Sequence, residues 1–249
     1  MIEALGIWTI RSEAKELGHL LRAQLGGELY LAAGDSAAGN REHFASAFRA
    51  HHQWVLVMTT GIAVRYLQGL LKDKKSDPGV VVLDEAARFA VALAGGHEGG
   101  ANELAYRVAN GVGAIPVITT ASEALKPLVL GIGCRKGVQQ SQIDAAVAHA
   151  LSLAGKRVED VREVATIDLK ANEPGLRKWC EARGIPMRII PREWINERPW
   201  MTQPSEWVKE NIGTGGVCEP CALLATHRGS LILPKTALNG VTVAIVSEP

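Results

Sequence analysis

Strand-like and helix-like segments alternate along almost the whole chain, and this alternation constrains the fold more than any other feature of the sequence. Short apolar runs typical of buried strands are separated by segments with apolar residues at helical spacing. Strands that alternate with helices form mostly parallel sheets covered by helices. For the first half we predict strands at 4–10, 28–32, 54–59, 80–84, 89–93 and 115–119 and helices at 12–25, 42–50, 63–71 and 102–110.

The alternation starts again after a polar segment, Ser122 to Pro127, which is typical of a domain boundary. The second half predicts strands at 128–132, 161–167, 187–190, 230–234 and 242–246 and helices at 141–154, 175–183, 206–210 and 220–226. We therefore expect two α/β domains, residues 1–123 and 127–249, each with a mostly parallel sheet flanked by helices.

Charge and apolar patterning exclude several classes of protein. The 27 Lys and Arg residues balance the 26 Asp and Glu residues, so no global field favours a nucleic acid as partner, and a small anionic ligand is easier to accommodate. Charged residues interrupt the most apolar stretch, 79–96, so no membrane segment is expected. Four cysteines and a chain start without a basic region predict a cytoplasmic protein with reduced thiols.

A glycine-rich block, Gly95-Gly-His97-Glu98-Gly99-Gly100-Ala-Asn102, joins a predicted strand to a predicted helix. Glycines permit a tight turn, and the start of a helix offers free N–H groups. His97 titrates near neutral pH, Glu98 is a second proton carrier, and amides near Gly99 and Gly100 could stabilise an oxyanion. The alternative is a glycine-rich loop whose His and Glu are merely solvated.

Two further segments follow strands of the second half. The turn from Gly131 to Gly137 could hold a carboxylate or phosphate, but it lacks the spacing of nucleotide-binding glycine loops, so a nucleotide is disfavoured. A plain turn with exposed Arg135 and Lys136 remains the alternative. The segment 166–174 places Asp168, Lys170 and Glu173 beyond a strand; its alternative role is surface pairing, with Asn172 or Glu173 capping the next helix.

Other polar groups invite simpler interpretations. Cys218 and Cys221 could supply half of a zinc site, but no matching second pair exists, so we expect no metal role. The run 72–75 is typical of a solvated helix end. His51 and His52 are expected to end the second helix and to carry no chemistry.

Both halves contain longer distinctive strings. They are GIAVRYLQGLLKDKKSDPGVVVLDEAARFAVALAGGHEGGANELA, IPVITT, VLGIGCRKGV, VATIDLKANEPGL, GTGGVCEPCALLA and LILPKT. These strings resemble the cobalt-precorrin-5A hydrolase (CbiG-type) family of anaerobic cobalamin biosynthesis. The resemblance runs in order from about Leu56 to Val246, whereas the residues before Gln53 carry little signal.

The resemblance implies two α/β domains and a cobalt-containing, heavily carboxylated tetrapyrrole substrate with a δ-lactone. It implies an enzyme that opens this lactone hydrolytically and releases acetaldehyde, giving cobalt-precorrin-5B. No cofactor of the protein's own is implied, because the cobalt arrives with the substrate. A homodimer and transient contact with other enzymes of cobalamin synthesis are further expectations.

Within the matched strings, His97 and Glu98 are the candidates for acid–base catalysis. Candidates for binding the substrate are glycines that permit close approach and polar or charged residues that suit carboxylates. They are Gly61, Arg65, Lys74, Lys75, Gly99, Gly100, Asn102, Gly131, Gly133, Cys134, Arg135, Lys136, Asp168, Lys170, Glu173, Gly215, Gly216, Glu219 and Lys235.

Two departures from the family pattern stand out. Many members carry an additional segment between the halves, which this chain lacks, and Cys221 stands where a small apolar residue is expected. Two competing functions remain. One is a non-catalytic carrier of corrinoid intermediates, because the carboxyl-terminal half alone resembles the small CobE-type proteins. The other is a nucleotide-binding protein.

Overall fold

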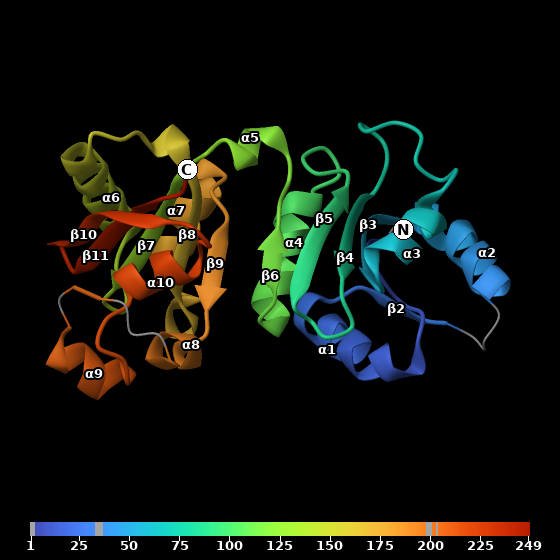
Figure 1. The fold of residues 1–249 in the computed structure, drawn as a ribbon, viewed down its shortest axis with the longest axis horizontal. Helices are drawn as coiled ribbons and strands as arrows, with labels where there is room; N and C mark the ends of the chain where they lie inside the picture. Colours follow the sequence, from blue (N-terminus) through green and yellow to red (C-terminus); the bar gives the residue numbers. More distant parts are fainter. Residues whose placement is uncertain (1–2, 33–36, 198–200, 203) are drawn as a thin grey trace. The chain divides into compact units, whose positions relative to one another are not determined.

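The computed structural model describes residues 3–32, 37–197, 201–202 and 204–249. The chain divides into two compact units, Met1–Thr120 (unit 1) and Ala121–Pro249 (unit 2), and each contains its own sheet (Figure 1). Within the described residues, no helix is both long enough and apolar enough to cross a membrane. The fold is mixed α/β in both units, with mostly parallel sheets flanked by helices, as predicted.

Unit 1 contains, within its described residues, a six-stranded sheet in the order β2-β1-β3-β4-β5-β6. Its strands are β1 (Glu3–Thr9), β2 (Glu28–Leu31), β3 (His51–Val57), β4 (Gly79–Leu83), β5 (Phe89–Ala94) and β6 (Ile115–Val117). Its helices are α1 (Lys15–Leu25), α2 (Ala37–Ala47), α3 (Thr60–Leu67) and α4 (Ala101–Val112), with 3₁₀ turns at Ser12–Ala14 and Phe48–Ala50.

One strand pair of this sheet departs from the parallel arrangement. β4 and β5 are antiparallel, with Val80 opposite Ala94, because the link between them is far shorter than the dozen or so residues that a parallel crossover needs. β5 therefore ends beside the beginning of β4. The loop that follows β5 consequently lies at the edge of the sheet where β3 and β4 begin.

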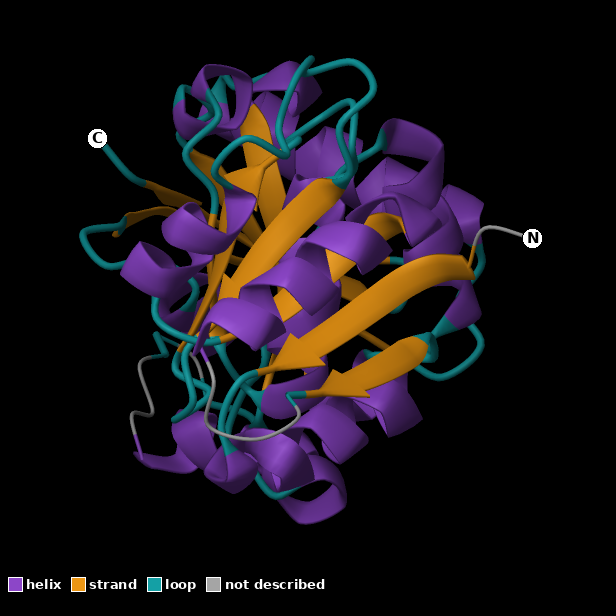
Figure 2. Cartoon of the chain, turned by 90° about the vertical axis from the view of Figure 1, so that its right-hand side faces the viewer, coloured by secondary structure: helices purple, strands orange, loops and turns teal. Residues whose placement is uncertain are grey.

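Alternating residues of the central strands bury both faces of this sheet. Val55 and Val57 pack with residues of α1 and α4, whereas Trp54 and Leu56 pack with residues of α2 and α3. Helices thus cover both faces (Figure 2). The prediction that His51 ends a helix is wrong: it begins β3, is 2% exposed, and its Nε2 lies 2.9 Å from the Tyr30 hydroxyl.

Unit 2 contains, where it is described, a five-stranded sheet in the order β10-β11-β7-β8-β9. Its strands are β7 (Leu128–Cys134), β8 (Val161–Ile167), β9 (Met187–Ile190), β10 (Ser230–Leu238) and β11 (Val241–Ser247). Its helices are α5 (Ala121–Ala124), α6 (Gln140–Ala154), α7 (Pro174–Arg183), α8 (Arg192–Glu197), α9 (Glu206–Ile212) and α10 (Cys218–Leu224), with 3₁₀ turns at Val158–Asp160 and Asp168–Lys170.

The strands β7, β8 and β9 are parallel, and β11 and β10 join them in antiparallel pairing. α6 and α7 pack on one face, and α8 and α10 pack on the other. Two short helices, α5 and α8, were not predicted because six or fewer residues show no clear helical periodicity. The parallel strands bring the loops after β7 and β8 to one edge of this sheet.

Candidate functional site

The glycine-rich block forms a closed loop, residues 95–100, which we call the His97 loop. The Ala101 N–H donates to the Gly95 carbonyl at 3.1 Å, and the Asn102 N–H donates to the Gly96 carbonyl at 3.0 Å. The Gly100 N–H donates to the His97 carbonyl at 3.1 Å. The expectation of free N–H groups at the start of α4 is therefore wrong for these amides, because they hold the loop closed.

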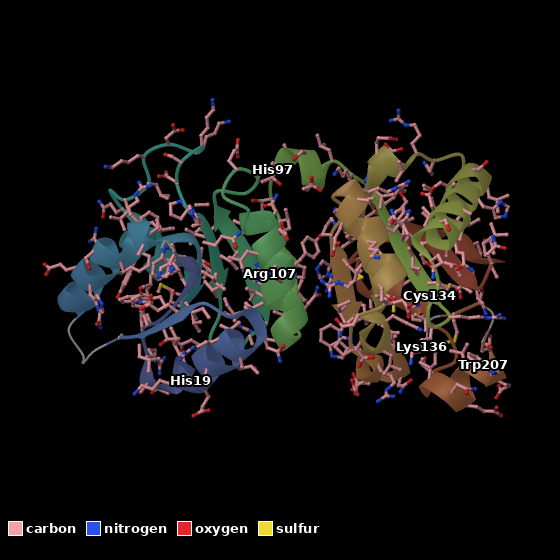
Figure 3. The ribbon with its side chains drawn as sticks, turned by 180° about the vertical axis from the view of Figure 1, so that it is seen from behind. His19, His97, Arg107, Cys134, Lys136 and Trp207 are labelled. Carbon is pink, nitrogen blue, oxygen red and sulfur yellow. The ribbon has the colours of Figure 1, made fainter. Side chains whose placement is uncertain are left out.

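The glycines are needed because backbone meets backbone where the loop rests on the start of β4. A Cβ on Gly99 would lie 2.6 Å from the Gly79 nitrogen, and one on Gly79 would lie 2.2 Å from the Gly99 carbonyl oxygen. Gly95 and Gly100 have φ of 66° and 73°, in the region that favours glycine. The loop is thus fixed by its backbone, while the side chains of Glu98 and of His97, which Figure 3 labels, are exposed.

Two side chains hold the loop at its flanks. Gln53, near the start of β3, donates from Nε2 to the Gly99 carbonyl at 3.3 Å and to the Gly100 carbonyl at 3.2 Å. Asn102 donates from Nδ2 to the Thr120 hydroxyl at 2.9 Å. Sequence reasoning missed Gln53, since it lies 46 residues before Gly99 and belongs to no motif.

The lysine run lies at the same edge of the unit 1 sheet. Lys74 Nζ is 3.9 Å from Glu98 Oε1, so the structure brings these two predicted residues together. The run is not a helix end, because α3 already ends at Leu67. Asp77, 8% exposed, instead organises the turn by accepting the Lys72 N–H at 2.6 Å and the Arg49 Nη2 at 3.0 Å.

Gly61 and Arg65 belong to a different part of unit 1. Both are exposed residues of α3, which follows the carboxyl end of β3. Because β3 and β4 are parallel, Gly61 lies at the edge opposite the His97 loop, about 17 Å away for a five-residue strand. The structure does not bring Gly61 together with His97.

In unit 2, the loops after β7 and β8 meet at one edge through Glu173. Its Oε1 accepts the Gly137 N–H at 2.8 Å, and its Oε2 lies 3.4 Å from Lys170 Nζ. Glu173 occupies the N-cap position of α7, as expected, but its side chain makes no capping hydrogen bond. This buried carboxylate ties the two loops together and is not directed to solvent.

Glu219, on α10, has an equivalent structural role. Its side chain is buried and accepts the Thr202 N–H at 2.6 Å and the Lys235 N–H at 2.9 Å, with the Thr202 hydroxyl at 2.5 Å. Burial tends to raise the pKa of Glu219, but these hydrogen bonds and the Lys235 charge outweigh it and leave the pKa below its ordinary value. The carboxylate is therefore held charged inside unit 2.

Close packing explains the glycines beside α10. A Cβ on Gly131 would lie 1.7 Å from the Cys218 carbonyl oxygen, and one on Gly133 would lie 2.7 Å from the Thr242 hydroxyl. A Cβ on Gly215 would lie 2.8 Å from the Met201 sulfur, and Gly216 is buried beside the same methionine.

The predicted residue Asp168 contacts its own turn: its carboxylate accepts the Leu169 N–H at 2.7 Å.

The four cysteines of unit 2 are free thiols, three of them buried and Cys134 half-buried. Burial raises the pKa of Cys218 to about 11 and that of Cys221 well above its ordinary value, so both thiols stay protonated near neutral pH. Burial also raises the pKa of Cys134 to about 11. Among the described residues, no group of three or more His, Cys, Asp or Glu could hold a metal ion.

At this edge of unit 2, two carboxylates are buried and two cations are exposed. The carboxylates of Glu173 and Glu219 are buried and satisfied within the unit, whereas Arg135 and Lys136 are exposed. Figure 3 shows Cys134 and Lys136 at the end of β7. Exposed cations beside internally neutralised acids make an edge that attracts carboxylates or phosphates.

Comparison with known proteins assigns each half of the chain to a family. Residues 42–123 match the family described as Cobalamin synthesis G N-terminal, and residues 128–246 match the family described as Cobalamin synthesis G C-terminus. The fold and these two matches define a two-domain α/β protein of cobalamin synthesis.

Individual relatives narrow this class. The chain is 48% identical to a cobalt-precorrin-5A hydrolase of Salmonella typhimurium strain LT2, over 80% of this chain and 83% of the relative. It is 23% identical to a cobalt-precorrin-5A hydrolase of Priestia megaterium, over 82% and 80%. It is 28% identical to Protein CobE of a Sinorhizobium species, over 49% of this chain and 80% of that protein. The chain belongs to the cobalt-precorrin-5A hydrolase family.

The aligned regions also bear on the missing segment. They run over 291 and 302 positions for the two hydrolases, more than the 249 residues of this chain, although each takes in only about four fifths of it. These relatives therefore carry residues that this chain lacks. Here only four residues, 124–127, separate the two family matches.

Proposed function

We propose that this enzyme hydrolyses cobalt-precorrin-5A, opening its δ-lactone and releasing acetaldehyde to give cobalt-precorrin-5B. The observation that carries the proposal is the presence of both family domains in one chain, with 48% identity to the Salmonella typhimurium relative. The substrate supplies the cobalt, and the proposed reaction uses no cofactor of the protein's own.

Lactone opening requires a base that activates water, donors for the developing oxyanion and an acid for the departing oxygen. His97 is our candidate base, since an imidazole nitrogen can accept a proton and this one stands at the exposed tip of a fixed loop. Glu98 is our candidate for the second proton transfer. The Gly99 N–H is the remaining amide candidate for the oxyanion, because the Gly100 N–H donates to the backbone carbonyl of His97.

Hydrolysis forms a carboxyl group and leaves a hydroxyethyl group on the macrocycle. Loss of the hydroxyl proton and cleavage of the adjoining carbon–carbon bond then release acetaldehyde, and the bond electrons pass into the conjugated ring, which takes up a proton. The protein mainly has to hold the geometry and move these protons. Lys74, Lys75, Arg135 and Lys136 are the exposed cations that we propose bind substrate carboxylates.

The carrier function is the second candidate, because a relative that matches only about half of this chain, 49%, exists as a separate protein. The two functions are distinguished by anaerobic incubation of the purified protein with cobalt-precorrin-5A. The hydrolase proposal predicts one acetaldehyde per corrinoid converted, with many turnovers per protein. Tight binding of the substrate with no acetaldehyde would instead establish a carrier.

The remaining expectations are part of the same proposal. We take the enzyme to be cytoplasmic and homodimeric, with transient contacts to other enzymes of cobalamin synthesis. Sedimentation of the purified protein tests the oligomeric state, since a monomer has the mass of 26.6 kDa.

A further inference from the structure

A distant side chain, Gln53, contacts the His97 loop from the central strand β3. Gln53 and Gly79 are directly opposite each other on β3 and β4. Because Gly79 has no side chain, the Gln53 amide can reach across it to the Gly99 and Gly100 carbonyls. Gln53 therefore contacts the two residues that follow Glu98 in the loop.

We propose that Gln53 is a positioning residue for the reaction: it holds the Gly99–Gly100 backbone so that His97 and Glu98 face the substrate in a fixed geometry. This inference rests on the proposed function. Gln53 does not touch the substrate in this account. It acts through the loop, because its single amide group restrains both of the carbonyls that separate the catalytic candidates from α4.

The surroundings show why this position needs a glutamine. A donor is required, since both partners are carbonyl oxygens that only accept. A neutral donor suits the site, because a carboxylate of the same shape would face the two oxygens with no proton to offer. Gly100 matches it from the other side: a Cβ there would lie 2.6 Å from the Gln53 Nε2. The glycine and the amide thus fit each other.

The other restraints on the loop do not replace Gln53. The hydrogen bonds from Ala101 and Asn102 close the loop on itself, and the Leu104 N–H donates to the Gly100 carbonyl at 3.0 Å, but these bonds all join residues within the loop and α4. The Asn102 amide ties the start of α4 to Thr120. Only the Gln53 contact, among those described for the loop carbonyls of 99 and 100, connects them to the central strand β3. Its loss should loosen the tip while leaving α4 in place.

The test compares wild type with Gln53→Met, which keeps the length of the side chain and removes the donor, and with Gln53→Glu, which keeps the shape and removes the proton. Gln24→Met is the matched control, since Gln24 is an exposed residue of α1. Steady-state rates of acetaldehyde formation give kcat and KM, and hydrogen exchange of the peptide spanning 95–102 reports the loop without any substrate.

We expect kcat to fall about 30-fold in Gln53→Met and further in Gln53→Glu, with KM changed less than about twofold, because misplacing a catalytic group by about 1 Å costs up to about 100-fold. Exchange of the loop amides should rise at least about fivefold, the effect of losing one of the two Gln53 hydrogen bonds, while exchange in β4 and α4 stays at the wild-type level. Gln24→Met should match wild type in every measurement.

A wild-type kcat in Gln53→Met would overturn the inference, as would faster exchange throughout unit 1, which would show a merely structural role. These outcomes are distinct from failure of the proposed function, which would show as an absence of acetaldehyde from wild type itself. In that case the exchange of the 95–102 peptide still decides whether Gln53 holds the loop.

Discussion

The His97 loop of unit 1 and the β7–β8 edge of unit 2 carry similar residues but use their acids in opposite ways. In the His97 loop, Glu98 is exposed and its strongest described contact is a 3.9 Å ion pair with Lys74. At the edge of unit 2, Glu173 and Glu219 are buried, and backbone N–H groups occupy their oxygens. The first arrangement leaves a carboxylate exposed, whereas the second uses carboxylates to hold segments together inside the unit.

A charged residue in a matched motif can have a structural role, as Glu219 shows. Glu219 was a candidate for binding the substrate, yet its side chain joins Thr202 to Lys235 inside the unit. Arg135 and Lys136 of the same unit are exposed cations, so anions in solution can reach them. A buried carboxylate with several donors stabilises the loops that present such cations.

Glu219→Gln should have the largest effect on stability. The substituted amide can accept fewer hydrogen bonds and turns an NH₂ toward N–H donors, so we expect the free energy of unfolding of unit 2 to fall by about 2 kcal/mol. Urea denaturation followed by circular dichroism measures the change. Glu181→Gln, on the exposed surface of α7, is the control and should leave the urea midpoint unchanged. A wild-type midpoint in Glu219→Gln would remove the structural role of this carboxylate.

The contribution of Glu219 to stability depends on pH. The pKa of Glu219 is lower in the folded unit than in the unfolded chain, so its charged form favours folding; this stabilisation is complete above the unfolded pKa of about 4.3 and is lost as pH falls through the folded pKa. The penalty of Glu219→Gln should therefore shrink as the pH is lowered from 6 to 3. A penalty that stays constant over this range would show that the charge of Glu219 contributes nothing.

Lys74→Ala should have the smallest effect on stability, within about 0.5 kcal/mol, because its pair with Glu98 is long and its side chain is 79% exposed. Thermal denaturation in low and high salt measures this change. A loss above 1 kcal/mol would show that Glu98 is held by its ion pair and so resembles the acids of unit 2. KM, in contrast, should rise if Lys74 binds a substrate carboxylate.

Much of the fold was predictable because the apolar spacing is strong on every buried strand. The antiparallel β5 could also have been predicted, since residues 85–88 are too few for a crossover. The start of β3 at His51 was missed because two histidines break the apolar run, although His51 is buried against Tyr30. Its burial depends on a tertiary aromatic contact that no local pattern reveals.

The candidate site was predictable only in part, for a similar reason. Glycine spacing indicated the His97 loop, and a glycine requires no distant information to be recognised as a turn former. The restraint by Gln53 arises from strand register, because it depends on Gly79 standing opposite on the neighbouring strand. The hydrogen bond from the Gly137 N–H to the Glu173 carboxylate likewise joins residues 36 positions apart.

Anaerobic turnover of cobalt-precorrin-5A by His97→Ala tests whether the His97 loop performs the chemistry. His19→Ala is the matched control, since His19 is an exposed histidine of α1 (Figure 3). We predict that His97→Ala keeps the melting temperature and substrate affinity of wild type while its rate of acetaldehyde release falls at least about 100-fold. His19→Ala should retain the wild-type rate. Undiminished acetaldehyde release by His97→Ala would contradict the account.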